Sequence, residues 1–298
     1  MANITTSLVG DSIPTIVAAE ALGYLKANTV LARLVNRDYS NEIATYGQTV
    51  TIPYGGALSV NDKAANTVVT LQTPNDAVYT LTLNKHKEVS FLIEDIAKAF
   101  ARPDWFTRYM QDGMMKLAEQ VDSDIAALYS GFSQSIDATA GITETTFRNA
   151  RRLLNSAKAP QNQRYFIGSE DADYEILGIE RVINRDYTET LGSKAADSMV
   201  GRFMGFDLFM DQMIATSGGE VKNLAMHRDA IVMASRPLPP APAGAGVVQR
   251  VMDEDGVGIR VTMSYSPDYL GVQLTLDMLY GVAELRDNHG VIIRSTEL

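Results

Sequence analysis

Apolar and polar residues alternate with a period of two along much of the segment from residue 47 to residue 93. In the first run, positions 50, 52 and 54 are apolar, and positions 49, 51 and 53 form the other side. Similar alternation follows at 69–71, 79–83 and 89–93, with Gly, Asn and Asp between the runs. Because successive side chains of a strand point to opposite faces, this pattern predicts β-strands separated by turns.

This strand-rich segment forms a long arm that contains no predicted helix. An arm of this size has no core of its own, so its apolar face needs another surface to cover it. We expect that surface to belong to a second copy of the chain. The arm residues predicted to make this inter-subunit contact are Val50, Ile52, Tyr54, Val69, Leu71, Tyr79, Leu81 and Leu83.

The period then changes to that of a long amphipathic helix from Asp104 to Tyr129. Pro103 suits the first turn, and Asp104 is favourable at the positive end of the helix dipole. Its apolar face repeats at spacings of three and four and consists of Phe106, Met110, Met114, Leu117, Val121, Ile125 and Leu128. At 1.5 Å per residue the helix would be about 39 Å long. We expect it to be a spine against which a sheet packs.

The rest of the chain mixes the two periods. Helices are predicted after Thr143, ending before Pro160, and after Ser169. Strands are predicted at 165–167 and 206–210, and 230–233 reads as a buried strand or the end of a short helix. A Pro- and Gly-rich connection covers 237–246, and strands follow at 247–252, 259–266 and 272–279. A final hairpin is predicted to turn at 288–290. The fold class is therefore α+β.

The amino-acid composition and charge exclude or disfavour several classes of function. The 298 residues are 46% hydrophobic and include no Cys, which excludes disulfides and thiol chemistry. The formal net charge of −10 disfavours direct DNA binding, and Arg148, Arg151 and Arg152 read as a solvated helix face. No apolar run is long enough to span a membrane, and residues 1–11 lack a signal-peptide layout, which predicts synthesis in the cytosol.

Candidate chemistry is sparse. His86, His227 and His289 show no spacing typical of a metal site or of a base and nucleophile pair. The acidic run 253–255 precedes a Gly and favours a turn over a calcium site. We therefore predict no catalytic residues, no metal, no cofactor and no enzyme activity.

Several short segments, in order and spacing, resemble the major capsid proteins of tailed bacteriophages, which share the HK97 fold. The matching segments are 34–39 with 47–52, the 91–96 lead into the long helix, 201–206, 223–230 and 279–286. The resemblance implies an N-terminal arm at 1–45 and an extended hairpin loop at 46–87. It implies a peripheral domain with the spine helix and C-terminal strands at 88–140 and 247–298, and an axial α/β domain at 141–246.

The resemblance also implies a function and partners. The chain is expected to be a structural coat subunit that assembles into the pentamers and hexamers of an icosahedral head around double-stranded DNA. Expected partners are other copies, a separate scaffolding protein, a portal and a decoration protein, with no sequence-specific nucleic-acid contact and no membrane. The expected location is the virion, after assembly in the bacterial cytoplasm. Two alternatives stay open: an encapsulin-type cargo shell, and another phage structural protein such as a tail tube subunit.

Overall fold

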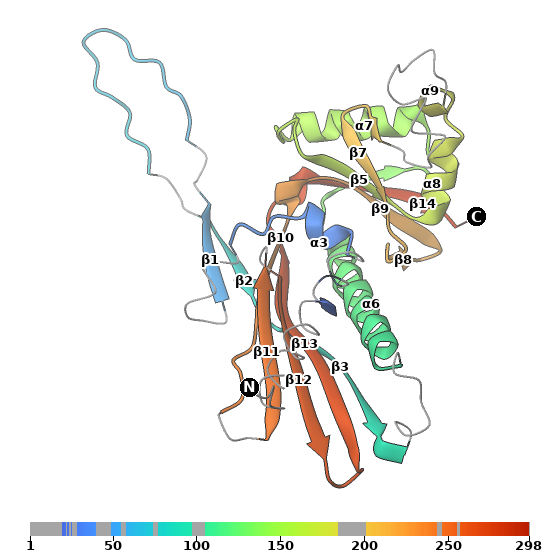
Figure 1. Cartoon of the computed structure of the whole chain (residues 1–298). Coiled ribbons are helices and arrows are strands. Elements are labelled where there is room, and N and C mark those ends of the chain that lie inside the picture. The colour runs from blue at the N-terminus through green and yellow to red at the C-terminus, as the bar shows by residue number, and fades with distance from the viewer. Residues whose placement is uncertain are drawn as a thin grey trace, which may run out of the picture.

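Figure 1 shows the computed structural model of the chain, which consists of two stacked sheet-and-helix units and a loop that projects from their side. The structure describes residues 29–39, 49–54, 58–73, 77–96, 105–183, 201–242, 246–254 and 257–297, together with Glu20, Ala21, Gly23 and Leu25. Across these residues, every helix is too short or too polar to cross a lipid bilayer.

The first unit is an antiparallel sheet built around the long strand β13, Gly271–Glu284. On one side β13 pairs with β3 (Lys85–Glu94). On its other side it pairs first with β12 (Val257–Ser266) and then with β10 (Ile231–Arg236). Strand β11, Val247–Glu254, pairs with β12 and forms the edge. The strands predicted at 247–252, 259–266 and 272–279 are therefore present. Of the two alternatives for 230–233, the buried strand is found, as β10, preceded by a 3-10 turn at Arg228–Ala230.

Helix α6, Trp105–Ala126, packs along one face of this sheet (Figure 1). It is shorter than the predicted helix from Asp104 to Tyr129 because the chain tightens into a 3-10 turn at Ala127–Gly131. Gly113 lets helix and sheet approach closely, since a Cβ there would lie 3.2 Å from a Val89 methyl carbon. The short helix α3, Leu31–Leu34, contacts α6 and adds Leu31 and Leu34 to the same core.

The second unit is a mixed sheet in the order β4-β14-β9-β5-β7-β6, with β8 paired to β9. Its strands are β4 (Gln134–Asp137), β5 (Arg164–Gly168), β6 (Arg202–Phe203), β7 (Phe206–Met210), β8 (Thr216–Ser217), β9 (Glu220–His227) and β14 (Gly290–Thr296). The helices α7 (Glu144–Ser156) and α8 (Glu170–Leu177) share a buried apolar cluster with one face of this sheet. The short helix α9, Glu180–Ile183, follows α8.

The two longer helices of the second unit, α7 and α8, begin where the sequence predicts. Thr143 and Thr146 form a reciprocal capping box at the start of α7. The Ser169 hydroxyl accepts a hydrogen bond from the Ala172 amide at 3.3 Å at the start of α8. Phe147 on α7 then packs on Phe166 and Phe203, with ring centroids 5.0 and 5.2 Å apart.

The predicted final hairpin is wrong, because β13 and β14 belong to different sheets. After β13 the chain passes through a 3-10 turn at Asp287–His289 and enters the second sheet as β14. The crossing runs beside the one from β9 to β10, and the Leu285 amide donates to the Ala230 carbonyl at 2.8 Å. Turn-forming residues at 287–290 therefore mark a change of sheet, with both strands satisfied by other partners.

Sheet membership also differs from the division of the chain that the family resemblance implies. Strands β4 and β14, expected in the peripheral domain, lie in the second sheet. Strand β10, expected in the axial domain, lies in the first sheet. The chain thus passes between the two units near residues 132, 230 and 287, and the last two crossings lie side by side and run in opposite directions.

Candidate assembly surfaces

The projecting loop has a base that is folded onto its own subunit. Strands β1 (Thr49–Tyr54) and β2 (Ala77–Thr82) form a separate two-stranded ladder with Ile52 opposite Tyr79 and Val50 opposite Leu81. Their buried side chains join β10 and the chain just after β13 in one apolar cluster. Its buried members are Ile52, Leu81, Leu83, Val232, Ala234 and Leu285.

The backbone at the end of β2 also packs closely against the backbone of β13. A Cβ on Gly281 of β13 would lie 2.2 Å from the Thr82 carbonyl oxygen and 3.1 Å from the Leu83 Cα. Real Cβ atoms do not approach a backbone oxygen so closely. Gly281 is therefore the contact that lets the end of β2 cross directly over β13.

Beyond the base, residues 58–73 extend away from both units, as Figure 1 shows in pale blue. Every residue in this stretch is exposed, including Val60 at 99% and Val68 at 90% of full exposure. The two limbs are tied together by Gln72, whose side chain accepts from the Ser59 amide at 2.8 Å and donates to the Ser59 carbonyl at 2.5 Å. The loop thus presents apolar side chains that its own chain leaves uncovered.

The structure divides the predicted contact residues into distinct environments. Ile52, Leu81 and Leu83 are buried within their own chain, and Val50 and Tyr79 are partly buried beside them. Val69 and Leu71 are exposed on the loop. The alternation at 69–71 predicts a strand there, but residues 58–73 form no strand. The Tyr54 side chain lies outside the described residues.

Three exposed apolar loop residues escaped the sequence pattern. They are Leu58, Val60 and Val68. Leu58 and Val60 directly precede the turn residues Asn61 and Asp62, and Val68 lies next to Val69 and so falls outside the alternation at 69–71. Counting apolar residues inside a predicted turn region would have found them.

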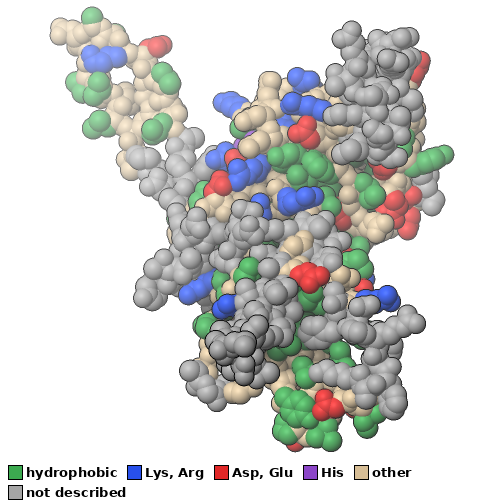
Figure 2. All heavy atoms as spheres, in the orientation of Figure 1, with side chains coloured by type: hydrophobic (Ala, Val, Ile, Leu, Met, Phe, Trp, Pro, Cys, Tyr) green, Lys and Arg blue, Asp and Glu red, His purple; other side chains and the backbone are tan. Residues whose placement is uncertain are grey.

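A second exposed apolar patch lies at the far end of the first sheet. It consists of Tyr265, Tyr269, Leu270 and Ile96, each at least half exposed. The patch is ordered by Asp95, whose carboxylate accepts from the Tyr265 hydroxyl at 2.9 Å and whose amide donates to the Leu270 carbonyl at 2.8 Å. The sequence analysis left residues 267–271 as the connection between the predicted strands 259–266 and 272–279 and did not identify the patch. Figure 2 shows apolar side chains gathered at this end.

The predicted core face of the spine helix lies against the sheet. Met110, Met114, Leu117, Val121 and Ile125 are all buried in the central cluster, and Leu128 is partly buried beside it. The Phe106 side chain lies outside the described residues.

The spine helix also carries a buried acid, Asp122, and a partly buried one, Asp124, in different environments. Asp122 accepts from the Val30 amide at 2.7 Å and the Ala32 amide at 3.0 Å, which ties the start of α3 to α6. Burial raises the pKa of Asp122 to about 7. Asp124 accepts from the Tyr280 hydroxyl at 2.6 Å and pairs with Lys85 at 3.1 Å. Burial, with the Asp124 carboxylate as a second cause, raises the pKa of Tyr280.

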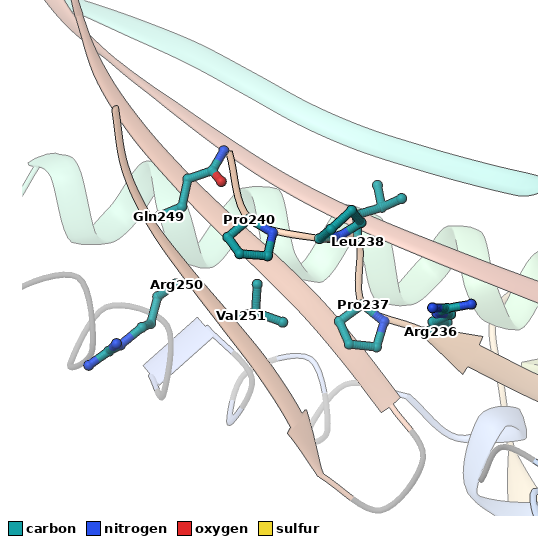
Figure 3. A pocket seen from close by; sticks show the side chains of 8 residues that line it. Arg236, Pro237, Leu238, Pro240, Gln249, Arg250 and Val251 are labelled. Carbon is teal, nitrogen blue, oxygen red and sulfur yellow. The ribbon is translucent and has the colours of Figure 1, made fainter. Parts of the chain in front are cut away.

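The outer face of the first sheet, opposite α6, carries a groove of about 470 Å³ between the proline-rich connection and β11 (Figure 3). It is lined by Arg236, Pro237, Leu238, Pro239, Pro240, Gln249, Arg250 and Val251. The Ala241 amide donates to the Gln249 side chain, and Arg260 donates to the Pro239 carbonyl at 2.9 Å, which fixes the connection on the sheet. These lining residues include no carboxylate, imidazole or hydroxyl that could act as a nucleophile or a base.

In the part of the chain that the structure describes, the three histidines do not gather with other potential metal ligands. His86 contacts Asp277 at 3.1 Å, and His227 and His289 are buried with their ring centroids 5.9 Å apart. Among the described residues, no group of three or more His, Cys, Asp or Glu side chains could hold a metal ion. The side chains of the acidic run 253–255 lie outside the described residues.

Comparison with known proteins gives matches at the level of structure. No protein-family model and no curated protein sequence matches the chain. A structure from Mycobacterium phage Che8 is 19% identical with a TM-score of 0.66, covering 89% of this chain and 90% of that one. The capsid structure of the cyanophage P-SCSP1u is 16% identical with a TM-score of 0.66, covering 91% and 89%.

A third similar structure is the asymmetric unit of the bacteriophage PhiM1 mature capsid. It is 11% identical with a TM-score of 0.59, covering 85% of this chain and 83% of that one. At such low identity the likeness is one of fold. The match runs over nearly the whole length of both chains in each case, so this chain has the fold of the phage capsid structures.

Proposed function

We propose that this chain is the major capsid subunit of a tailed bacteriophage, a structural protein that assembles in rings of five and six into an icosahedral head around double-stranded DNA. The observation that carries the proposal is the projecting loop. Its base is locked into its own subunit through Ile52, Leu81 and Gly281, while its far part presents uncovered apolar residues. Such a loop is built to reach a neighbouring copy.

The free energy of burying apolar surface favours contact between the loop and a neighbouring copy. Leu58, Val60, Val68, Val69 and Leu71 are all more than half exposed. Burying one such side chain is worth about 1.5–3 kcal/mol. Each copy would bring this gain to one neighbour, and many modest contacts in a closed shell add up through avidity. The extended HK97-type loop lying across a neighbour would provide that burial.

The remaining features fit a coat that encloses DNA without reading it. With a net charge of −10, the subunit repels a phosphate backbone, so the packed genome would slide along the wall. Assembly would take place in the bacterial cytoplasm with a separate scaffolding protein, and a portal and a decoration protein would complete the virion. The proposed role is structural and requires no catalysis.

The proposal is tested by assembly of the purified full-length chain. Electron microscopy of the concentrated protein is expected to show closed shells; tubes would favour a tail tube subunit, and dispersed monomers under all conditions would overturn the proposal. The loop is then tested by changing Leu58, Val60, Val68, Val69 and Leu71 to Ser. We expect loss of shells with an unchanged melting temperature, because these side chains contact little of their own chain.

A matched control changes five polar residues of the same loop to Ala. These residues are Asn61, Asp62, Lys63, Thr70 and Thr73, all exposed. The control protein should still form shells. If the apolar and polar variants assemble equally well, the loop is not the assembly contact.

A further inference from the structure

The second unit has a strongly basic side. Arg148, Arg151 and Arg152 are exposed on α7, whose sequence contains a single acid, Glu144. Arg151 donates to the Met204 carbonyl at 3.2 Å, which places it beside the turn between β6 and β7. Within the described residues, no carboxylate forms an ion pair with any of these three arginines. The charges of the three arginines are thus not neutralised by any of the residues that the structure describes.

The same unit has an acidic side formed by α8 and the start of α9. Residues 165–180 contain five acids and no Lys or Arg; the acids are Glu170, Asp171, Asp173, Glu175 and Glu180. Glu170 and Glu180 are exposed, and the Tyr174 ring between them is 73% exposed. Glu175 accepts from the Ile142 amide at 2.7 Å, so α8 lies beside the beginning of α7 and the arginines lie further along that helix.

Figure 2 shows the result on the surface of the upper unit. Lys and Arg side chains gather over its left and top, and Asp and Glu side chains gather at its right margin. A ring of identical subunits is a head-to-tail assembly, in which each copy uses two different surfaces. A basic side and an acidic side on one unit are complementary in that arrangement.

We propose that the Arg148–Arg152 side of α7 in one copy docks on the acidic α8 side of the next copy around each capsomer ring. The proposal rests on the proposed capsid function and names the surfaces that close its rings. Copies with a net charge of −10 repel one another, so a concentrated positive surface is needed to orient their approach. Exposed Arg and Tyr are also the residue types enriched at protein interfaces.

Charge reversal on each side tests the pairing. The basic-side variant is Arg148→Glu with Arg152→Glu, and the acidic-side variant is Glu170→Lys with Glu180→Lys. Each variant alone should lose at least tenfold in shell yield, measured by light scattering and electron microscopy. A protein that carries all four changes restores opposite charges at every contact and should recover shells. The charge-preserving control, Arg148→Lys with Arg152→Lys, should assemble like the unchanged protein.

A mixture of the two reversed proteins gives a sharper result. They can alternate around a ring of six with opposite charges at each contact, but a ring of five always leaves one contact between like charges. The mixture should therefore form six-membered rings and open sheets or tubes, without closed shells. All variants must keep the circular dichroism spectrum and melting temperature of the unchanged protein for these yields to be compared.

Two outcomes overturn the pairing while leaving the capsid function intact. In one, the unchanged protein forms shells and both reversed proteins form them equally well. In the other, the basic-side variant forms normal shells that hold less DNA, which would assign the arginines to the genome. Failure of the unchanged protein to assemble at all would instead contradict the proposed function.

Discussion

At the scale of single residues, Asp122 connects the protonation state of a buried acid to the attachment of the N-terminal segment. The Asp122 carboxyl group accepts two amides from the start of α3, with Asp211 and Arg33 as the neighbouring charged groups. Its folded pKa of about 7 lies above the unfolded value of 3.8. The folded state therefore holds the proton more tightly, and stability contributed by this group falls as pH rises from about 4 to 7.

Replacing the acid with Asn should remove this dependence. The unassembled subunit is expected to lose up to about 1.4 kcal/mol of unfolding free energy per pH unit through Asp122 across that window. The Asp122→Asn variant should show a flatter profile in urea unfolding measured between pH 5 and pH 8. A profile with the same slope as the unchanged protein would show that the carboxyl group does not titrate in this range.

At the scale of elements, the position of the loop depends on the contact between β2 and β13. Because a Cβ on Gly281 would meet the Thr82 carbonyl oxygen, no rotamer of a larger residue relieves the clash. Gly281→Ala should destabilise the subunit by about 1–3 kcal/mol, and Gly281→Val should do so at least as much. The measurement is thermal unfolding together with the rate of proteolysis in residues 58–73.

The control for this prediction adds one heavy atom elsewhere on the same strand. Ala283→Ser leaves the crossing with β2 unchanged, so it should cost less than Gly281→Ala. Equal costs for the two variants would mean that the strand, and not the crossing, is the sensitive feature.

The elements themselves were largely predictable, because local signals specify them. Thr143 and Ser169 begin their helices as expected, and the spine face from Met110 to Ile125 is buried as its spacing indicates. Pairing between distant strands has no local signal. Turn residues near position 288 look the same whether the chain folds back as a hairpin or crosses to another sheet, so the final hairpin was predicted wrongly.

At the scale of the whole molecule, the candidate surfaces were only partly predictable. Alternation identified Val69 and Leu71 on the loop, but it gave the same description to Leu81, which is fully buried in its own subunit. Periodicity reports which side chains are apolar, and only the fold determines which are covered. The charge separation between α7 and α8 was equally hidden, since each helix alone resembles an ordinary solvated face.

The two units are joined at a pair of buried histidines whose protonation should weaken the junction. His227 ends β9 and His289 precedes β14, so they stand at the two neighbouring crossings near residues 230 and 287. The His227 ring accepts from the Asp229 amide at 3.1 Å. Burial lowers the pKa of both rings, and the positive charges of Arg286 and Arg164 act in the same direction.

Lowered histidine pKa values mean that the unfolded chain binds protons more readily than the folded subunit below about pH 6.5. The stability that this pair contributes is complete above that pH and is lost as pH falls, by up to about 1.4 kcal/mol per histidine at pH 5.5.

The variant His227→Asn with His289→Phe keeps an acceptor for the Asp229 amide and a ring at position 289. It should lose less unfolding free energy on acidification than the unchanged histidine pair. Unfolding of both proteins is compared at pH 7.5 and 5.5 in the Asp122→Asn background, because Asp122 contributes the opposite slope. A loss as large in the variant as in its parent would place the acid sensitivity outside the junction.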